Sequence, residues 1–355
     1  MSLDFKALAA QYKSELLDKV MPFWLNNSID RECGGYFTCL ERDGSVFDTD
    51  KFIWLQGREV WMFATLYNKV EQRPEWLAAA EHGAAFLKKY GHDGNLNWYF
   101  ALDREGRPLV EPYNIFSYTF AVIAFGQLAL ATGNKEYEEI ARKTFDIVLS
   151  KVDNPKGRWN KAAKGARSMK SFALPMILCN VALEIEPLLD PDFLKKTIDT
   201  CIHEVMDVFY KPELGLIVEH LGTDGELVDC MDGRLLNPGH AIEAMWFIMD
   251  LGKRLGRPLQ QLEWDQKLWW VHIETLITMI KGYRLTGDPR CLEWFERVHD
   301  YVWSHFADPD YPEWFGYLNR RGERLLSLKG GKWKGCFHVP RGLYQCWQVL
   351  EELGK

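Results

Sequence analysis

The chain has 355 residues, of which 47% are hydrophobic and 26% are charged, so it can bury a large core and is not disordered as a whole. Its 43 lysines and arginines are outnumbered by 50 aspartates and glutamates, which gives a net charge of −7. Because no basic field is available to attract a polyanion, we do not expect nucleic acid as a partner.

No segment has the composition of a secretion signal or a membrane anchor. Residues 1–20 mix charged and apolar side chains as an amphipathic helix does. The longest weakly polar run, Ser117–Gly133, contains Gln127 and is shorter than the roughly 20 residues that cross a bilayer, so it is predicted to be a core helix. Eight cysteines lie scattered without the spacing of zinc ligands, so we expect no metal site and a location in the reducing cytoplasm.

Most long segments repeat apolar residues at helical spacing. Val60, Phe63, Ala64 and Tyr67 show the pattern, which places apolar side chains on one face of a helix. The chain is therefore predicted to be mostly helical. Most of its 15 tryptophans are expected to be large core residues at helix contacts, although aromatic faces can also stack on sugar rings.

Short hairpins are predicted between helix pairs, because a few extended residues are followed by a polar turn that ends in glycine. They occupy residues 35–44, 98–106, 216–225 and 314–322. The turn glycines at 44, 106 and 225 are 62 and 119 residues apart, so a degenerate copy is expected near 165, where residues 154–160 have a turn composition. The interval from 225 to 322 is only 97 residues, so a stretch is predicted to be missing near 256–261.

Six helix pairs of about 60 residues, each closed by a turn or hairpin, describe an all-α (α/α)6 barrel, a toroid of inner and outer helices. No linker divides the chain, so residues 1–355 are predicted to form a single domain. The inner helices of such a toroid converge on a central cavity. Polar groups at their entrances are therefore the candidates for chemistry.

Two such entrances lie before residue 250. Arg58 occurs at the start of an apolar-periodic helix, where its guanidinium could bind a substrate oxygen or form a structural ion pair. Asn237–Glu243 begins another helix, with His240 and Glu243 three residues apart on one face. A carboxylate beside an imidazole fixes its tautomer and raises its basicity, as a general base requires; a structural histidine is the alternative.

Two further entrances lie near the C-terminus. Trp270 and Glu274 place an aromatic ring one turn from a carboxylate, although core residues would give the same spacing. His338 and Arg341 form a second pair three residues apart and lead into a final helix predicted over residues 342–353. Two histidines on different inner helices suggest proton transfer on opposite faces of one carbon, which is the chemistry of epimerisation.

These motifs resemble those of the N-acylglucosamine 2-epimerase family over nearly the whole chain. The most specific are Gln56–Arg58, Asn237–Glu243, residues 263–270 with Glu274, and Lys334–Arg341. Residues 170–176 are similar to the subgroup that acts on N-acetylglucosamine. The resemblance implies an (α/α)6-barrel isomerase that interconverts N-acetylglucosamine and N-acetylmannosamine in the cytoplasm.

The same resemblance implies roles for individual residues. His240 and His338 match the catalytic acid/base pair, and the substrate-binding and supporting positions match Arg58, Lys170, Glu243, Trp270, Glu274 and Arg341. It implies no metal and no cofactor for the chemistry, a homodimer, and activation by ATP or another nucleotide at an allosteric site. No phosphate-binding loop of the GxxxxGK[ST] type occurs in the chain.

In the expected reaction, the ring-opened sugar presents C1 as an aldehyde, one histidine removes the C2 proton and the other returns a proton to the opposite face. An arginine, Arg58 or Arg341, would stabilise the enolate oxygen. The alternatives are a cellobiose 2-epimerase or an aldose–ketose isomerase on the same fold, an inverting glycosidase that uses Glu243 and Glu274, and a non-enzymatic binding protein.

Overall fold

The structure, a computed structural model, describes residues 4–211, 214, 216–255, 268–318, 322–324, 326–331 and 333–355. The chain packs into two compact units. The larger comprises Cys33–Gly35 and Lys51–Leu262, and the smaller comprises Met1–Glu32, Tyr36–Asp50 and Glu263–Lys355. The missing stretch predicted near 256–261 lies outside the described residues, and the single domain over 1–355 stays a prediction.

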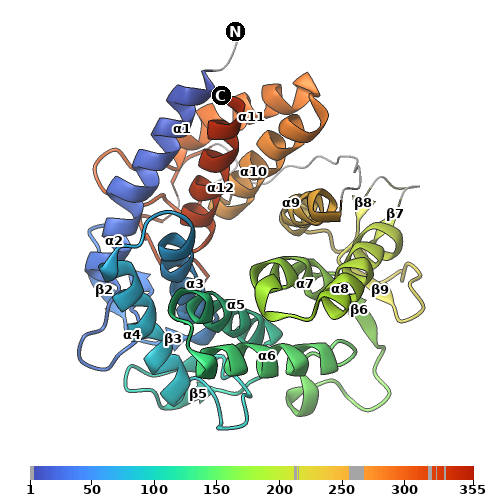
Figure 1. The fold of residues 1–355 in the computed structure, drawn as a ribbon. Helices are drawn as coiled ribbons and strands as arrows, with labels where there is room; N and C mark the ends of the chain where they lie inside the picture. The colour runs from blue at the N-terminus through green and yellow to red at the C-terminus, as the bar shows by residue number, and fades with distance from the viewer. Residues whose placement is uncertain are drawn as a thin grey trace. The chain divides into compact units, whose positions relative to one another are not determined.

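The larger unit is built from alternating helices in two layers. One layer consists of helices that pack against one another in chain order, and the other consists of helices that cover them (Figure 1). The first layer contains α3 (Ile53–Lys69), α5 (Ile115–Thr132), α7 (Ala173–Glu184) and α9 (Pro238–Leu255). The second contains α4 (Pro74–Tyr90), α6 (Lys135–Ser150) and α8 (Pro191–His203), and three short helical stretches are η2 (Gly157–Trp159), η3 (Glu186–Leu188) and η4 (Glu204–Phe209).

Helix α5 is apolar on all sides because it packs against α3, α6 and α7. The side chain of Asn114 caps its first turn by accepting from the backbone N–H of Phe116, and Gly133 ends it in the left-handed conformation at φ 69°. By length and composition it could cross a membrane, but most of its residues are buried within the unit. The core helix predicted over Ser117–Gly133 is therefore confirmed.

The strands are short, and most of them pair in antiparallel fashion with the next strand in the sequence. In the larger unit, β3 (Lys51–Phe52), β4 (Ala101–Leu102) and β5 (Pro108–Val110) form one sheet, while β6 (Met169–Ser171) pairs with β9 (His220–Gly222) and β7 (Tyr210–Lys211) with β8 (Leu216–Ile217). In the smaller unit, β1 (Cys39–Leu40) pairs with β2 (Val46–Asp48). The turn predicted at the end of residues 216–225 is present, since the N–H of Gly222 donates to the carbonyl of Glu226, while β8 and β9 each pair with an earlier strand.

The predicted turn glycines are confirmed as a structural repeat. In three turns, a residue accepts at its carbonyl from the glycine three positions later and donates its N–H to the carbonyl four positions later, which leaves the glycine at positive φ. These turns start at Glu41, Asp103 and Gly222 and place φ at 90° for Gly44, 93° for Gly106 and 85° for Gly225. Each glycine faces the end of the preceding helical segment, as Gly106 faces Tyr90 at the end of α4.

Two other predicted turns show part of this pattern. In the fourth, Leu318 pairs with Arg324 and Gly322 has φ 88°, while 319–321 lie outside the described residues. Near 165, the degenerate copy consists of η2 followed by Gly165 at φ 81°.

The smaller unit joins both ends of the chain. Its helical segments are α1 (Phe5–Ser14), the π-helical η1 (Glu15–Val20), α2 (Met21–Asn27), α10 (Trp269–Thr286), α11 (Pro289–His305) and α12 (His338–Leu353). Helix α12 packs between α10 and the N-terminal segment, and α11 packs on α10. The amphipathic helix expected in residues 1–20 is thus observed over residues 5–20, first as α1 and then as η1.

Helix α12 begins at His338, four residues before the predicted start at 342. The predicted start leaves Pro340 outside the helix, whereas the structure places it in the first turn. Proline fits the first turn, where its missing N–H has no helical acceptor. His338 and Arg341 are therefore both inside α12, and the helix itself fixes their spacing.

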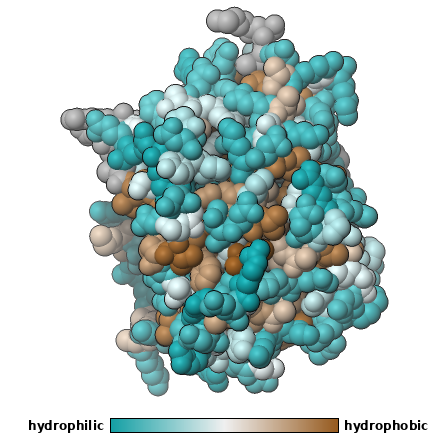
Figure 2. All heavy atoms as spheres, turned by 90° about the vertical axis from the view of Figure 1, so that its left-hand side faces the viewer, coloured by the Kyte–Doolittle hydropathy of each residue, from teal (hydrophilic) through white to brown (hydrophobic). Residues whose placement is uncertain are grey.

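The core contains many of the aromatic residues. Trp24, Trp61, Trp98, Trp246 and Trp314 are fully buried, as expected for large residues at helix contacts. The face of the molecule in Figure 2 is mostly hydrophilic, and hydrophilic side chains interrupt its hydrophobic areas.

Candidate active site

His240 lies in the first turn of α9, where its imidazole meets a buried carboxylate. Its Nδ1 is 3.0 and 3.1 Å from the two carboxylate oxygens of Glu219, which is 5% exposed. Asn237 accepts from the backbone N–H of His240 through Oδ1 at 3.4 Å, at the entrance of the helix. With Nδ1 bonded to a carboxylate, the proton on that nitrogen is fixed and the ring is oriented.

Glu219 is held by the β6–β9 pair rather than by a helix. Its carbonyl accepts from the backbone N–H of Phe172 at 2.9 Å, directly after β6, and β9 follows it. Glu219 was not among the residues predicted from the sequence. The available signal was a charged residue between Val218 and Leu221, two side chains that are buried in the core.

The surroundings of His240 favour its protonated form. Burial by itself lowers the pKa of His240, but the hydrogen bond and the charge of Glu219 outweigh this effect and raise the pKa above its usual value. Glu243, on the next turn of α9 and 5% exposed, adds to the increase through its charge. Glu243 was the predicted carboxylate partner of His240. In the structure, the carboxylate that is hydrogen-bonded to Nδ1 of His240 is that of Glu219.

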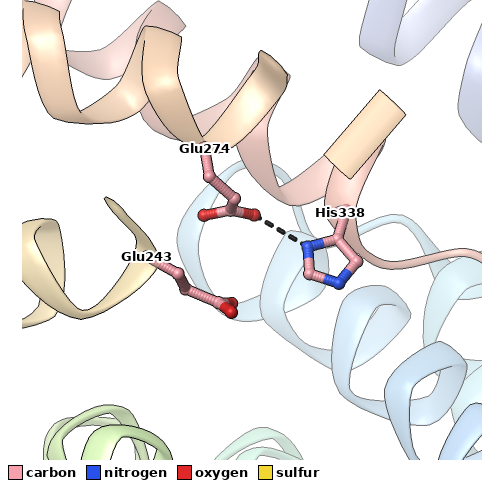
Figure 3. Close-up of side chains that lie close together, drawn as sticks. All are labelled: Glu243, Glu274 and His338. Carbon is pink, nitrogen blue, oxygen red and sulfur yellow. Dashed lines mark hydrogen bonds and ion pairs between the residues drawn. The ribbon is translucent and has the colours of Figure 1, made fainter. Parts of the chain in front are cut away.

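The second imidazole, His338, starts α12 in the smaller unit. Its Nδ1 is 2.8 Å from Oε1 of Glu274 on α10, the interaction drawn in Figure 3. Glu274 is fully buried and His338 is 8% exposed. The ring of Trp270 lies 5.6 Å from the His338 ring at an angle of 41°. The structure therefore brings together the three residues that the sequence placed at two separate helix starts.

Arg341 completes this group. Its Nη2 donates to the same Oε1 of Glu274 at 2.5 Å, and its guanidinium stacks 4.3 Å from the ring of Phe337. Glu274 and His338 carry the donor atoms that metals bind, but the Arg341 cation already occupies that carboxylate oxygen. The arrangement suits proton transfer by an oriented imidazole more than metal binding.

Arg58 lies in the second turn of α3, since this helix begins at Ile53, earlier than predicted. Its guanidinium lies 4.4 Å from the ring of Trp54 and 4.2 Å from that of Phe120, and the residue is 7% exposed. Stacking between two aromatic rings fixes the plane of a guanidinium at little cost in side-chain entropy. Such a cation is oriented for an oxygen anion.

Lys170 has a different setting from the other candidates. It belongs to β6, and its ammonium lies 2.8 Å from Oε2 of Glu204 in η4, with both side chains partly exposed. Its predicted role in substrate binding stays a prediction.

The sequence model described as N-acylglucosamine 2-epimerase matches residues 35–264 and 255–340. An N-acylglucosamine 2-epimerase from Bos taurus is 38% identical over 383 aligned positions, which cover 95% of this chain and 90% of the relative. The chain belongs to the N-acylglucosamine 2-epimerase family. The predicted activity class, a sugar 2-epimerase and hence an isomerase, is confirmed by this membership.

More distant members share the fold. A cellobiose 2-epimerase from Ruminococcus albus is 23% identical over 97% of this chain and 98% of its own. The structure of cellobiose 2-epimerase from Spirochaeta thermophila DSM 6192 matches with a TM-score of 0.85 at 19% identity, covering 99% of this chain and 98% of the other. The predicted (α/α)6 barrel is confirmed by this likeness. The 383 aligned positions exceed the 355 residues of this chain, so the Bos taurus relative has residues without a counterpart here.

Proposed function

We propose that the protein interconverts N-acetylglucosamine and N-acetylmannosamine by moving the proton at C2 of the ring-opened sugar. The observation that carries the proposal is the pair of imidazole–carboxylate dyads, His240 with Glu219 and His338 with Glu274. The choice of substrate is supported by the 38% identity to the N-acylglucosamine 2-epimerase, against 23% to the cellobiose 2-epimerase.

The chemistry starts from the acidity that the C1 aldehyde gives to the C2–H bond. One imidazole takes the C2 proton, and the electron pair of the broken C–H bond moves into the C1–C2 bond and onto O1 as an enolate. The other imidazole then gives a proton to the opposite face of C2, the pair returns to carbon, and the configuration inverts. Because Nδ1 of each ring is bonded to its carboxylate, we assign both proton transfers to Nε2.

The enolate oxygen needs a fixed positive charge. Arg58, stacked between Trp54 and Phe120, and Arg341, bonded to Glu274, are the two cations that we propose for this role. Each step of general acid or base catalysis contributes about 10²- to 10⁴-fold to the rate. Loss of either histidine should therefore leave little epimerase activity.

The rival reactions use these groups differently. An aldose–ketose isomerase returns the proton to C1 instead of C2. An inverting glycosidase needs one carboxylic acid and one carboxylate as base, and would leave both histidine dyads without a chemical role. The dyads therefore favour epimerisation.

Other properties of the protein are also proposals. Proton transfer next to a carbonyl needs no cofactor, so we propose full activity after dialysis against a chelator. ATP or another nucleotide is proposed as an allosteric activator, the homodimer as the active assembly, and the cytoplasm as the location. Activity with and without ATP, sedimentation and cell fractionation test these three proposals.

Incubation of the purified protein with N-acetylmannosamine in D2O, with and without ATP, tests the central proposal. We expect N-acetylglucosamine as the product, with deuterium at C2. Product without solvent deuterium would contradict the separate acid and base, and a ketose product would favour the isomerase. Mannose and cellobiose, supplied in parallel, distinguish the other substrates.

A further inference from the structure

A group of buried charges lies beside the His338 dyad in the smaller unit, in the loops that precede α12. The ammonium of Lys334 is 2.7 Å from Oε1 of Glu313 and donates to the carbonyl of Lys329 at 2.9 Å. Lys329 in turn donates to the carbonyl of Glu313 at 2.6 Å and pairs with Asp308 at 2.9 Å. The side chains of Lys329, Asp308 and Glu313 are 0% exposed, and that of Lys334 is 1% exposed.

Glu313 is held in an unusual conformation. Its φ is 70°, in the left-handed region that a residue with a side chain rarely adopts. Its carboxylate accepts from the indole N–H of Trp24 at 2.9 Å and from the backbone N–H of Trp314 at 2.8 Å, as well as from Lys334. Three donors therefore fix the carboxylate despite the strained backbone.

Lys334 connects the starts of the two helices that carry the dyad. It precedes His338, the first residue of α12, by four residues. On its other side it packs against Gly316, where an added Cβ would lie 3.0 Å from Cδ of Lys334. The carbonyl of Gly316 accepts from the backbone N–H of Trp269, the first residue of α10, and the Lys334 ammonium lies 6.0 Å from the Trp269 ring.

Stability alone does not account for this group. Taking charged side chains out of water is unfavourable, and well-packed apolar residues often replace a buried ion pair without loss of stability. What an ion pair with fixed partners does provide is a defined geometry, here between the loop around Glu313, the start of α10 and the start of α12.

We propose that Lys334 and Glu313 are positioning residues for His338: their ion pair sets where α12 begins relative to Glu274 on α10. The inference rests on the proposed catalytic role of His338. A displaced imidazole reacts slowly even when substrate still binds, because proton transfer requires close alignment of the reacting atoms. The pair should therefore affect kcat much more than KM.

The chain offers a matched control for Glu313 in the larger unit. Glu184 on α7 is also a buried carboxylate that accepts from a tryptophan, Trp61 at 3.0 Å, and faces a lysine, Lys69 at 3.5 Å. Glu184→Gln therefore makes the same chemical change as Glu313→Gln in a place that has no proposed link to His338.

The experiment compares Glu313→Gln, Lys334→Met and Glu184→Gln with the wild type in the full chain, well below each melting temperature. We expect Glu313→Gln and Lys334→Met to lower kcat by about 10- to 100-fold while KM changes less than about 3-fold. Glu184→Gln should keep kcat within about 2-fold of the wild-type value, even if its melting temperature falls as far as those of the other two variants. Retained kcat in the first two variants, or an equal loss in the third, would overturn the inference.

A second measurement separates this inference from the proposed function. The ring Cε1–H resonance of His338, assigned with His338→Asn, should move in Lys334→Met and stay in Glu184→Gln. If the wild type does not epimerise the sugar but this resonance moves, the proposed function is wrong and the positioning role stands. An unmoved resonance contradicts the positioning role whatever the activity.

Discussion

The carboxylate of Glu219 lies 3.0 and 3.1 Å from Nδ1 of His240, although the two residues belong to different elements and are 21 positions apart. Glu219 follows β8, and His240 opens α9. Glu274 and His338 are paired in the same way, with the carboxylate on α10 and the imidazole on α12. Each histidine thus receives its carboxylate from a neighbouring element instead of from its own helix.

Replacement of Glu219 should weaken His240 as an acid/base group. Because Glu219 raises the pKa of His240 against the effect of burial, Glu219→Gln should lower that pKa, and the limb of the pH–rate profile that His240 sets should move to lower pH. We expect kcat to fall about 10- to 100-fold. NMR titration of the His240 ring measures the shift, and Glu226→Gln, at an exposed glutamate after β9, is the control. An unchanged His240 pKa in Glu219→Gln would contradict the dyad.

Loss of one histidine should leave half of the reaction. In His240→Asn and His338→Asn, epimerisation should drop at least about 10²-fold, because one proton transfer has lost its catalyst. The remaining imidazole can still remove the C2 proton of the epimer whose hydrogen faces it. Each variant should then exchange that proton with D2O in one epimer only, and the two variants should select opposite epimers. Exchange of the same epimer by both variants would refute two separate bases, and the exchange pattern would also show which histidine serves which epimer.

The stacked guanidinium of Arg58 should not be replaceable by lysine. An ammonium has no plane to stack between Trp54 and Phe120, so Arg58→Lys should lower kcat/KM by about 10- to 100-fold. Arg73→Lys is a suitable control, because Arg73 stacks on Trp76 at 4.6 Å and is only partly buried. Steady-state kinetics with N-acetylmannosamine give the comparison. Equal effects at both positions would argue against a substrate role for Arg58.

Two glycines at positive φ, Gly94 and Gly106, should differ in their tolerance of a side chain. Gly94 and Gly106 have φ values of 85° and 93°, but a Cβ at Gly94 meets nothing within 4 Å, whereas one at Gly106 comes 2.5 Å from the Tyr90 ring. Gly94→Ala carries only the backbone strain, about 1–2 kcal/mol of unfolding free energy. Gly106→Ala adds a steric overlap, so its loss should be larger. Chemical denaturation measures both, and equal losses would mean that Tyr90 moves aside freely.

Local patterns in the sequence predicted the repeated turns well. Glycine at the end of a polar turn readily adopts a positive φ because it has no side chain. The conformations of Gly44, Gly106 and Gly225 could therefore be predicted from local sequence alone. The pairing of β6 with β9 could not be placed in this way. It joins Lys170 to Leu221 across about fifty residues, and no local pattern specifies the partner.

The same difference applies to the candidate site. Residues at helical spacing, such as Trp270 with Glu274, were found because one helix sets their relation. Glu219 was missed because its partnership with His240 depends on a strand pair and a connecting loop. The predicted catalytic roles of His240 and His338 stay predictions that the isotope-exchange experiment can test.

Helix α5 has a consequence for synthesis of the protein on the ribosome. Until α3, α6 and α7 pack around it, its apolar residues form a segment that targeting factors could mistake for one destined for the lipid bilayer. Its neighbours in the chain reduce this exposure, since α3 has already emerged when α5 is made and α6 follows after only two residues. The order of the helices along the polypeptide thus shortens the time during which the newly made segment is vulnerable to mistargeting or aggregation.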